Sequence, residues 1–173
     1  MRVTRTVSLA ILLVTSAGCA IHQNAEPTAF PEGVLVGRHS AGTVALANAQ
    51  TVTEPANIGS LGMYGTMYGN LSQWTDAAIE LLTKKLKDSG MTVSTASSRK
   101  LSLAVTDARI GYTGGGFAWA CAVTLSVEGE DGLKAKFVGE RASWKYQRVC
   151  DAAISEAVAE ILRDDRVLAY LGY

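Results

Sequence analysis

The chain has 173 residues, of which 16 are Lys or Arg and 16 are Asp or Glu, so its formal net charge is zero. A chain with balanced charge and no basic run longer than KKLK at residues 84–87 lacks the positive surface that nucleic-acid binding requires. Hydrophobic residues make up 48% of the sequence, and its length suits one compact domain with a real core.

The first 18 residues have the pattern of a secretory signal peptide. Arg2 and Arg5 precede an apolar run at residues 7–14, and the small residues Ser-Ala-Gly follow at 16–18. The apolar run is too short to cross a bilayer, for which about 20 residues are needed. We therefore expect residues 1–18 to be cleaved off.

Cys19 directly follows these small residues, and this arrangement resembles the lipobox of bacterial lipoproteins. Ser16 departs from that pattern, which usually has Leu or another branched aliphatic residue three positions before the cysteine. The resemblance implies that a peptidase cuts before Cys19 and that the thiol is acylated, which would anchor the protein to a membrane. Loss of Arg2 and Arg5 would leave 14 of the 16 basic residues against 16 acidic ones, a net charge of −2. The alternatives are an ordinary cleaved signal peptide and an uncleaved N-terminal anchor.

Residues 19–33 are predicted to be the lipidated N-terminus and a flexible tether, because this polar segment contains two of the three prolines and shows no regular periodicity. Residues 34–173 then form a single α+β periplasmic domain. Its first strand is predicted within residues 42–52, where Val44 and Leu46 alternate with smaller residues.

Residues 53–70 are predicted to be a long, glycine-rich connection, and such loops are usually functional or mobile. Met63, Tyr64, Met67 and Tyr68 lie in it, and their adaptable side chains favour a partner-binding surface. The alternative is that these side chains fold back on the domain's own core.

Residues 71–90 predict a helix, since apolar residues recur at helical spacing along one face. Asn70 or Ser72 can cap its start, lysines suit its last turns, and Gly90 can end it.

Strands are predicted over residues 91–96, 100–112, 116–130 and 133–147, with a turn at residues 129–132 and a last helix after them. The odd positions from 117 to 127 are apolar and should face the core. The whole pattern predicts an α+β fold, in which an antiparallel sheet of about four to five strands carries two main helices on one face.

The even positions of the third of these strands include Ala118, Ala120 and Ala122, which form a second candidate contact surface. The bulky side chains of the next strand could cover this alanine face, or another protein could bind there.

Removing Cys19 from the thiol count leaves Cys121 and Cys150 as a pair. Cys121 lies on the predicted core side of its strand and Cys150 in the first turn of the last helix. In an oxidising periplasm such a pair predicts a disulfide, with Cα atoms about 4.4 to 6.8 Å apart. A reactive thiolate at the helix start and two free buried thiols are the alternatives.

Motifs for chemistry are largely missing from the sequence. The glycines at 111 and 114–116 precede a strand and lack dinucleotide-loop spacing, and His22 and His39 are the only histidines. The acidic pairs near residues 128–131 and 164–165 suit a turn and a helix end. We therefore expect no catalytic residue, metal site or cofactor, and we expect the protein not to be an enzyme.

The lipobox, the helix LSQWTDAAIELLTKKLKDSGMTV, the strand KLSLAVTDARI, the hairpin GFAWACAVTLSVEGEDGLKAKFVGERASW and the closing CDAAISEAVAEILRDDRVLAYL together resemble the YajG-like bacterial lipoproteins. They are more loosely similar to auxiliary lipoproteins of ABC-type transport systems and to the lipopolysaccharide-assembly lipoprotein. The likeness spans roughly residues 42–171 and transfers no catalytic residue.

The resemblance implies a lipid-anchored outer-membrane lipoprotein whose periplasmic domain binds an envelope protein or a lipid-like partner. Ala20, where Asp would usually retain a lipoprotein in the inner membrane, favours the outer membrane. The alternatives are an auxiliary lipoprotein of an ABC-type envelope transport system and a thiol-dependent periplasmic enzyme that uses Cys121 or Cys150.

Overall fold

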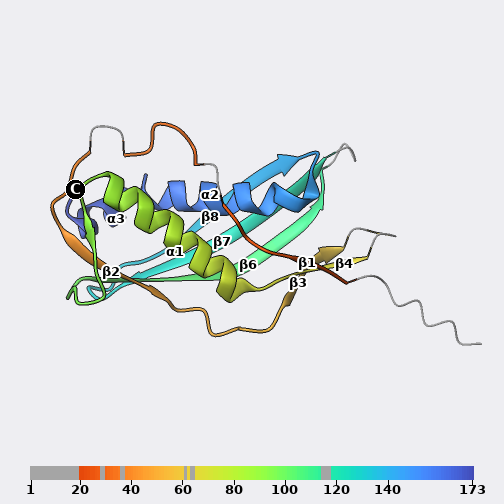
Figure 1. Ribbon diagram of the computed structural model, residues 1–173, viewed down its shortest axis with the longest axis horizontal. Helices are drawn as coiled ribbons and strands as arrows, with labels where there is room; N and C mark the ends of the chain where they lie inside the picture. Colours follow the sequence, from red (N-terminus) through yellow and green to blue (C-terminus); the bar gives the residue numbers. More distant parts are fainter. Residues whose placement is uncertain (1–19, 28–29, 36–37, 61, 63–64, 114–117) are drawn as a thin grey trace, which may run out of the picture.

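The computed structural model describes residues 20–27, 30–35, 38–60, 62, 65–113 and 118–173. These residues form an elongated domain with one mixed sheet and three α-helices (Figure 1). The elements in chain order are β1 (Ala20–Gln23), β2 (Thr43–Asn48), β3 (Ala56–Ser60), β4 (Thr66–Gly69), α1 (Leu71–Asp88), β5 (Thr92–Val93), β6 (Lys100–Tyr112), β7 (Trp119–Gly129), β8 (Lys134–Ser143), the 3₁₀ turn η2 (Tyr146–Arg148), α2 (Val149–Ile161) and α3 (Asp165–Leu171).

The sheet is built around β6. On one edge β6 pairs antiparallel with β7, and β7 pairs antiparallel with β8. On the other edge β2 and β3 pair with β6 in parallel, β2 along its first half and β3 near its end. Strand β5 extends the sheet beyond β2, and β4 and β1 extend it beyond β3.

This arrangement corrects the predicted sheet, which was to be antiparallel with about four to five strands. The described residues contain eight strands, and four of the pairings between them are parallel. The missed strands β1, β3 and β4 have four or five residues each, too few to show a clear alternation, and two of them lie in the segment that was predicted to be a loop.

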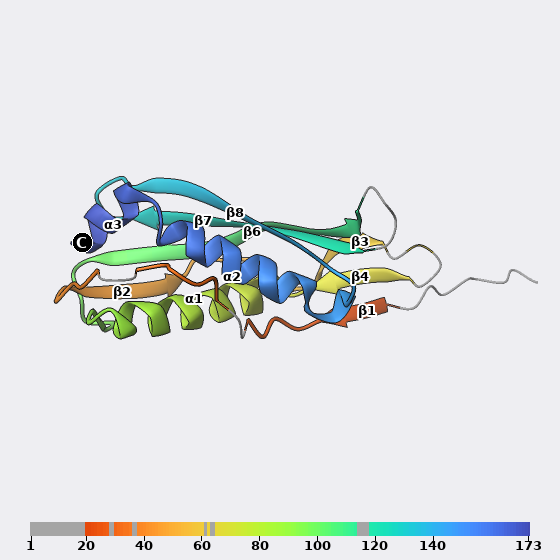
Figure 2. The same ribbon diagram turned by 90° about the horizontal axis from the view of Figure 1, so that it is seen from above.

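The two longer helices pack on the same face of the sheet, α1 against β6 and β2, and α2 against β7 and β8 (Figure 2). The side chain of Asn70 caps α1 by accepting a hydrogen bond from the Gln73 amide at 3.0 Å. Gly90, at φ = 92°, follows the end of α1. The predicted helix and its cap are thus observed.

The alternation predicted for β7 is also observed. Its odd positions from Cys121 to Val127 are fully buried beneath the helices, while Ala122, Thr124 and Ser126 on the opposite face are partly exposed. In β6 a bulge between Val105 and Asp107 shifts this alternation by one residue. For that reason the core residues of β6 are at odd positions before the bulge and at even positions after it.

β2 ends at Asn48, and two side chains bind the backbone groups of Val105 in β6. The buried hydroxyl of Thr75 on α1 accepts a hydrogen bond from the Val105 amide at 2.9 Å and donates one to the Leu71 carbonyl at 2.8 Å. The side-chain amide of Gln50 donates to the Val105 carbonyl. These bonds fix both α1 and the segment after β2 to the middle of β6.

Replacing Thr75 by Val should therefore lower the free energy of unfolding by about 1 to 3 kcal/mol, the cost of leaving a buried amide unpaired. Val has nearly the shape of Thr, so packing around the site is kept. Urea denaturation measures the effect. Thr124→Val on the partly exposed face is the matched control and should change stability by less than about 0.5 kcal/mol; equal effects of the two variants would contradict the role given to Thr75.

A glycine lets α2 lie unusually close to β8. A Cβ atom added at Gly139 would lie 1.9 Å from the carbonyl oxygen of Ala153 and 2.4 Å from the backbone nitrogen of Ala157. Both atoms belong to the helix backbone, so the contact requires a residue without a side chain.

Candidate functional site

The segment that follows the predicted lipidation site is part of the folded domain. β1 pairs in parallel with β4, from Ala20 opposite Thr66 to Gln23 opposite Gly69. This corrects the prediction of a flexible tether for residues 20–23. Polarity was misleading there, because an edge strand exposes much of its surface and needs no continuous apolar pattern.

Buried hydrogen bonds hold the end of β1. Gln23 is only 6% exposed, and its side-chain amide donates to the carbonyls of Tyr146 and Gln147 at 3.2 and 3.0 Å. The indole of Trp74, in the core, donates to the Gln23 carbonyl at 3.2 Å. Residues 146 and 147 lie far from Gln23 in sequence, so the periodicity of single helices and strands could not predict these contacts.

A charged cluster lies beside this strand. The carboxylate of Asp151 on α2 accepts a hydrogen bond from the Glu26 amide at 3.0 Å, and Arg148 lies 3.4 Å from Asp151 and 3.6 Å from the Glu26 carboxylate. Burial raises the pKa of Asp151 above its usual 3.8, against the lowering effect of the Glu26 amide and Arg148. With neighbouring residues of β1 and η2, these side chains line a hollow of about 390 Å³.

Because its pKa is raised in the folded protein, Asp151 binds a proton more tightly there than in the unfolded chain. The stabilisation from this proton is present below pH 3.8 and is lost as the pH rises through the folded-state pKa. Asp151→Asn cannot ionise but still offers an oxygen to the Glu26 amide. Denaturation at a series of pH values should show the stability of the wild type falling relative to the variant as the pH rises; parallel curves would contradict this.

The predicted partner-binding residues do not form one surface in the described part of the chain. Met63 and Tyr64 lie outside the described residues, as does Cys19. Met67 is 1% exposed and belongs to the hydrophobic core, as in the alternative in which these side chains fold back. Tyr68 is half-buried and stacks on His22 of β1, with ring centroids 5.7 Å apart.

A disulfide joins Cys121 of β7 to Cys150 of α2, with the two Cα atoms 5.1 Å apart. This separation lies within the predicted range, and both residues are buried. The bond ties the first turn of α2 to the core side of the sheet. Both sulfur atoms are therefore bonded, and neither is a free thiolate in this structure.

The alanine face of β7 is not covered by the next strand. β8 lies beside β7 in the same sheet, with Ala120 opposite Ala142 and Ala122 opposite Glu140, so the idea that its bulky side chains stack on this face is wrong. We call this side of β7 and β8 the outer face. It carries these residues: Ala120, Ala122, Thr124, Ser126, Lys136, Val138, Glu140 and Ala142.

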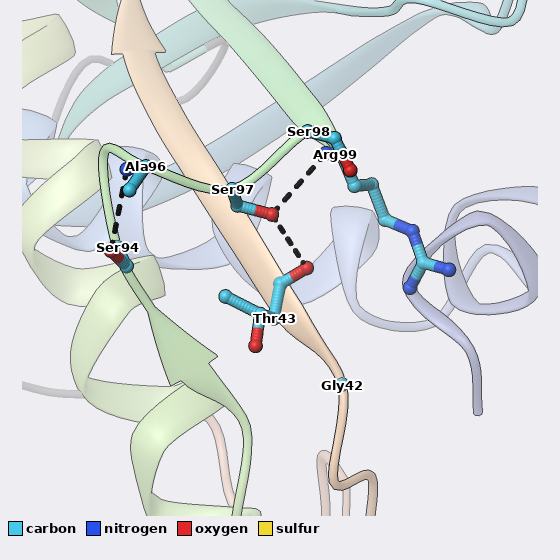
Figure 3. A pocket seen from close by; sticks show the side chains of 7 residues that line it. All are labelled: Gly42, Thr43, Ser94, Ala96, Ser97, Ser98 and Arg99. Atoms are coloured by element: carbon cyan, nitrogen blue, oxygen red, sulfur yellow. Dashed lines mark hydrogen bonds between the residues drawn. The ribbon is translucent and has the colours of Figure 1, made fainter.

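A second hollow, of about 420 Å³, lies near the C-terminus beside the serine-rich loop at residues 94–99 (Figure 3). Ser97 donates to the Thr43 carbonyl at 3.0 Å and accepts from the Arg99 amide at 3.2 Å. The Arg99 side chain points away from the serines and donates to the Leu171 carbonyl at 2.9 Å. These bonds hold the loop and the chain end together, so the hydrogen-bonded residues around the hollow have a structural role.

The acidic pairs seen in the sequence have structural partners. Asp164 caps α3 and binds Arg166, whose side chain lowers the pKa of this carboxyl group. Glu128 lies 3.4 Å from Lys134 across the β7–β8 hairpin. In the described ranges, no three or more His, Cys, Asp or Glu side chains gather as a metal site would require. No helix there has the length and apolar character needed to cross a bilayer.

No protein-family model matches the chain, and no curated protein matches it. Among solved structures it is similar to a Xanthomonas campestris protein of the DUF330 family, with 17% identity, a TM-score of 0.45, and coverage of 88% of this chain and 94% of that one. A minor lipoprotein from Acinetobacter baumannii has 14% identity and a TM-score of 0.44, over 72% of this chain and 90% of its own.

The PelC dodecamer from Paraburkholderia phytofirmans has 17% identity and a TM-score of 0.33, over 83% of this chain and 92% of its own. These values are too low to assign a family. The likeness to YajG-like lipoproteins therefore stays a prediction from the sequence.

Proposed function

We propose that the protein is a lipoprotein of the outer membrane, anchored on the periplasmic side through lipid on Cys19, and that its domain acts by binding an envelope protein or lipid-like partner. The observation that carries the proposal is the position of β1. It begins at Ala20, directly after Cys19, and is hydrogen-bonded into the sheet. Lipid on Cys19 would thus attach to the folded domain itself.

The disulfide argues against catalysis by a thiolate of Cys121 or Cys150. A thiol-dependent enzyme would need a free thiolate at Cys121 or Cys150, and both sulfurs are bonded and buried. Two residues of the acidic pairs also have structural partners: Asp164 caps α3, and Glu128 pairs with Lys134 across the β7–β8 hairpin.

The outer face is the surface that we propose for the partner. Helices α1 and α2 cover the opposite side of the sheet. On the outer face, small side chains of β7 lie beside Val138, which is 54% exposed between Lys136 and Glu140 on β8. A flat surface of small residues allows close approach of another backbone, and the exposed valine adds an apolar contact.

Cys19→Ala tests the anchor. We expect the variant to leave the membrane fraction, because the acyl chains contribute about 0.8 kcal/mol for each buried methylene group and the substitution removes them. Fractionation of cells and the size of the processed chain give the readout. Unchanged processing together with unchanged membrane association would contradict lipidation at Cys19.

A photoreactive residue at Ala122 tests the outer face in intact cells. We expect crosslinks to an envelope component from this position and none from Lys87, an exposed residue of α1 that serves as the control site. If crosslinks form from Lys87 or from Tyr68 but not from Ala122, the outer face is not the binding surface.

A further inference from the structure

The strand register brings the start of β1 level with one end of the long strands. A line of paired residues crosses the sheet at this level: Ala20–Thr66, Thr66–Ser60, Gly59–Ile110, Ile110–Cys121 and Cys121–Arg141. Figure 1 shows this end of the molecule, with β1, β3 and β4, opposite the C-terminus. β1 starts here and runs inward, parallel to β4.

Four aromatic residues follow this line in the chain segments that cross it, and we call them the aromatic end. Tyr112 and Trp119 are two residues beyond the line, Trp144 is three and Tyr146 is five. Trp144 is 76% exposed and Tyr112 is 49% exposed. They are two of the four large hydrophobic side chains that are exposed in the described part of the chain. The Trp119 ring packs between Tyr112 and Tyr146, with centroids 3.8 and 6.0 Å away.

Cys19, the proposed lipidation site, directly precedes Ala20, and this position indicates that the aromatic end would contact the membrane. Consecutive Cα atoms are about 3.8 Å apart, so a lipid on Cys19 would be attached to the chain close to this line. Trp and Tyr prefer the interface between water and hydrocarbon, where one part of the ring is dry and its polar group stays wet. Lys145, which is exposed next to Trp144, can in addition attract anionic headgroups.

We propose that the aromatic end lies in the bilayer interface, with the Trp144 side chain among the lipid headgroups and Tyr112 beside it. This inference rests on the proposed lipid anchor at Cys19. The anchor supplies the attachment to the membrane, and the aromatic end sets which side of the domain faces it.

The test uses the full-length lipoprotein, purified and placed in vesicles of phosphatidylethanolamine and phosphatidylglycerol that contain a phospholipid brominated near its headgroup. Bromine quenches tryptophan fluorescence on contact, so the wild type should be quenched. Trp144→Ser should lose most of this quenching, since Trp74 is in the core and Trp119 is partly buried. Val138→Ser, which removes the exposed valine of the outer face, is the matched control and should be quenched like the wild type.

The mass of the purified protein separates the two proposals. If acyl groups are present on Cys19 and Trp144→Ser is quenched as strongly as the wild type, the inference is wrong while the lipid anchor stands. If the mass shows no acyl groups, the anchor is wrong and the inference falls with it. A dimer that dissociates in Trp144→Ser would assign this surface to a second copy and would also overturn the inference.

Discussion

Gly139→Ala should lower the free energy of unfolding by about 3 kcal/mol or more, the upper range for overpacking a core. The new methyl group would meet the backbone of α2 at Ala153 and Ala157, and a helix backbone cannot turn aside as a flexible side chain can. The clash would be relieved only if α2 moved away from β8, and this movement would open the core along the whole length of α2. Urea denaturation of the purified domain measures the loss.

Gly111→Ala is the control for this prediction. Gly111 lies in β6 at a position where an added Cβ atom would have no neighbour within 4 Å. This variant should be as stable as the wild type within about 0.5 kcal/mol, or slightly more stable because alanine restricts the unfolded chain. If both variants lose a similar free energy of unfolding, the effect would come from the backbone flexibility of strand glycines. The close packing of α2 on β8 at Gly139 would then not be its cause.

The second large effect is expected from the disulfide. Replacing both Cys121 and Cys150 by Ala removes a crosslink between residues 29 apart in sequence, which should lower the free energy of unfolding by about 3 to 4 kcal/mol in the chain-entropy model. The loss of two buried sulfur atoms adds a smaller packing cost.

Reduction of the wild type provides an independent check on this value. Unfolding in the presence of dithiothreitol should follow the curve of the double variant, because both lack the same crosslink. If the variant is as stable as the oxidised wild type, the bond contributes nothing to the fold. Two titratable thiols in protein purified without reductant would show that the bond does not form in the envelope.

Long periodic segments could be predicted from the sequence. Helix α1 with its Asn70 cap and the core face of β7 follow from spacing within a single element, and the cysteine pair follows from the thiol count. The bulge in β6 is consistent with the shift from Leu101, Leu103 and Val105 to Ala108 and Ile110, although an alternating pattern alone does not place it.

The short strands could not be predicted, because their stability comes from partners rather than from their own pattern. Met67 illustrates this: its sequence neighbours are polar or glycine, yet β1 and β3 flank it in the sheet and α1 follows. The contact between Glu26 and Asp151 joins residues 125 positions apart. No spacing rule within one segment can reveal such a pair, so the cluster beside β1 was missed.

The pairing of β1 with β4 also bears on how far the domain can reach. A flexible tether of about 15 residues would let the domain wander about 20 Å from its anchor and rotate freely. With β1 fixed in the sheet, a lipid on Cys19 would hold the domain close to the membrane surface, in the orientation that the aromatic end sets. A partner in the same membrane would then meet the outer face by diffusion in two dimensions, and a partner whose binding site stood at a different height would be excluded by geometry alone.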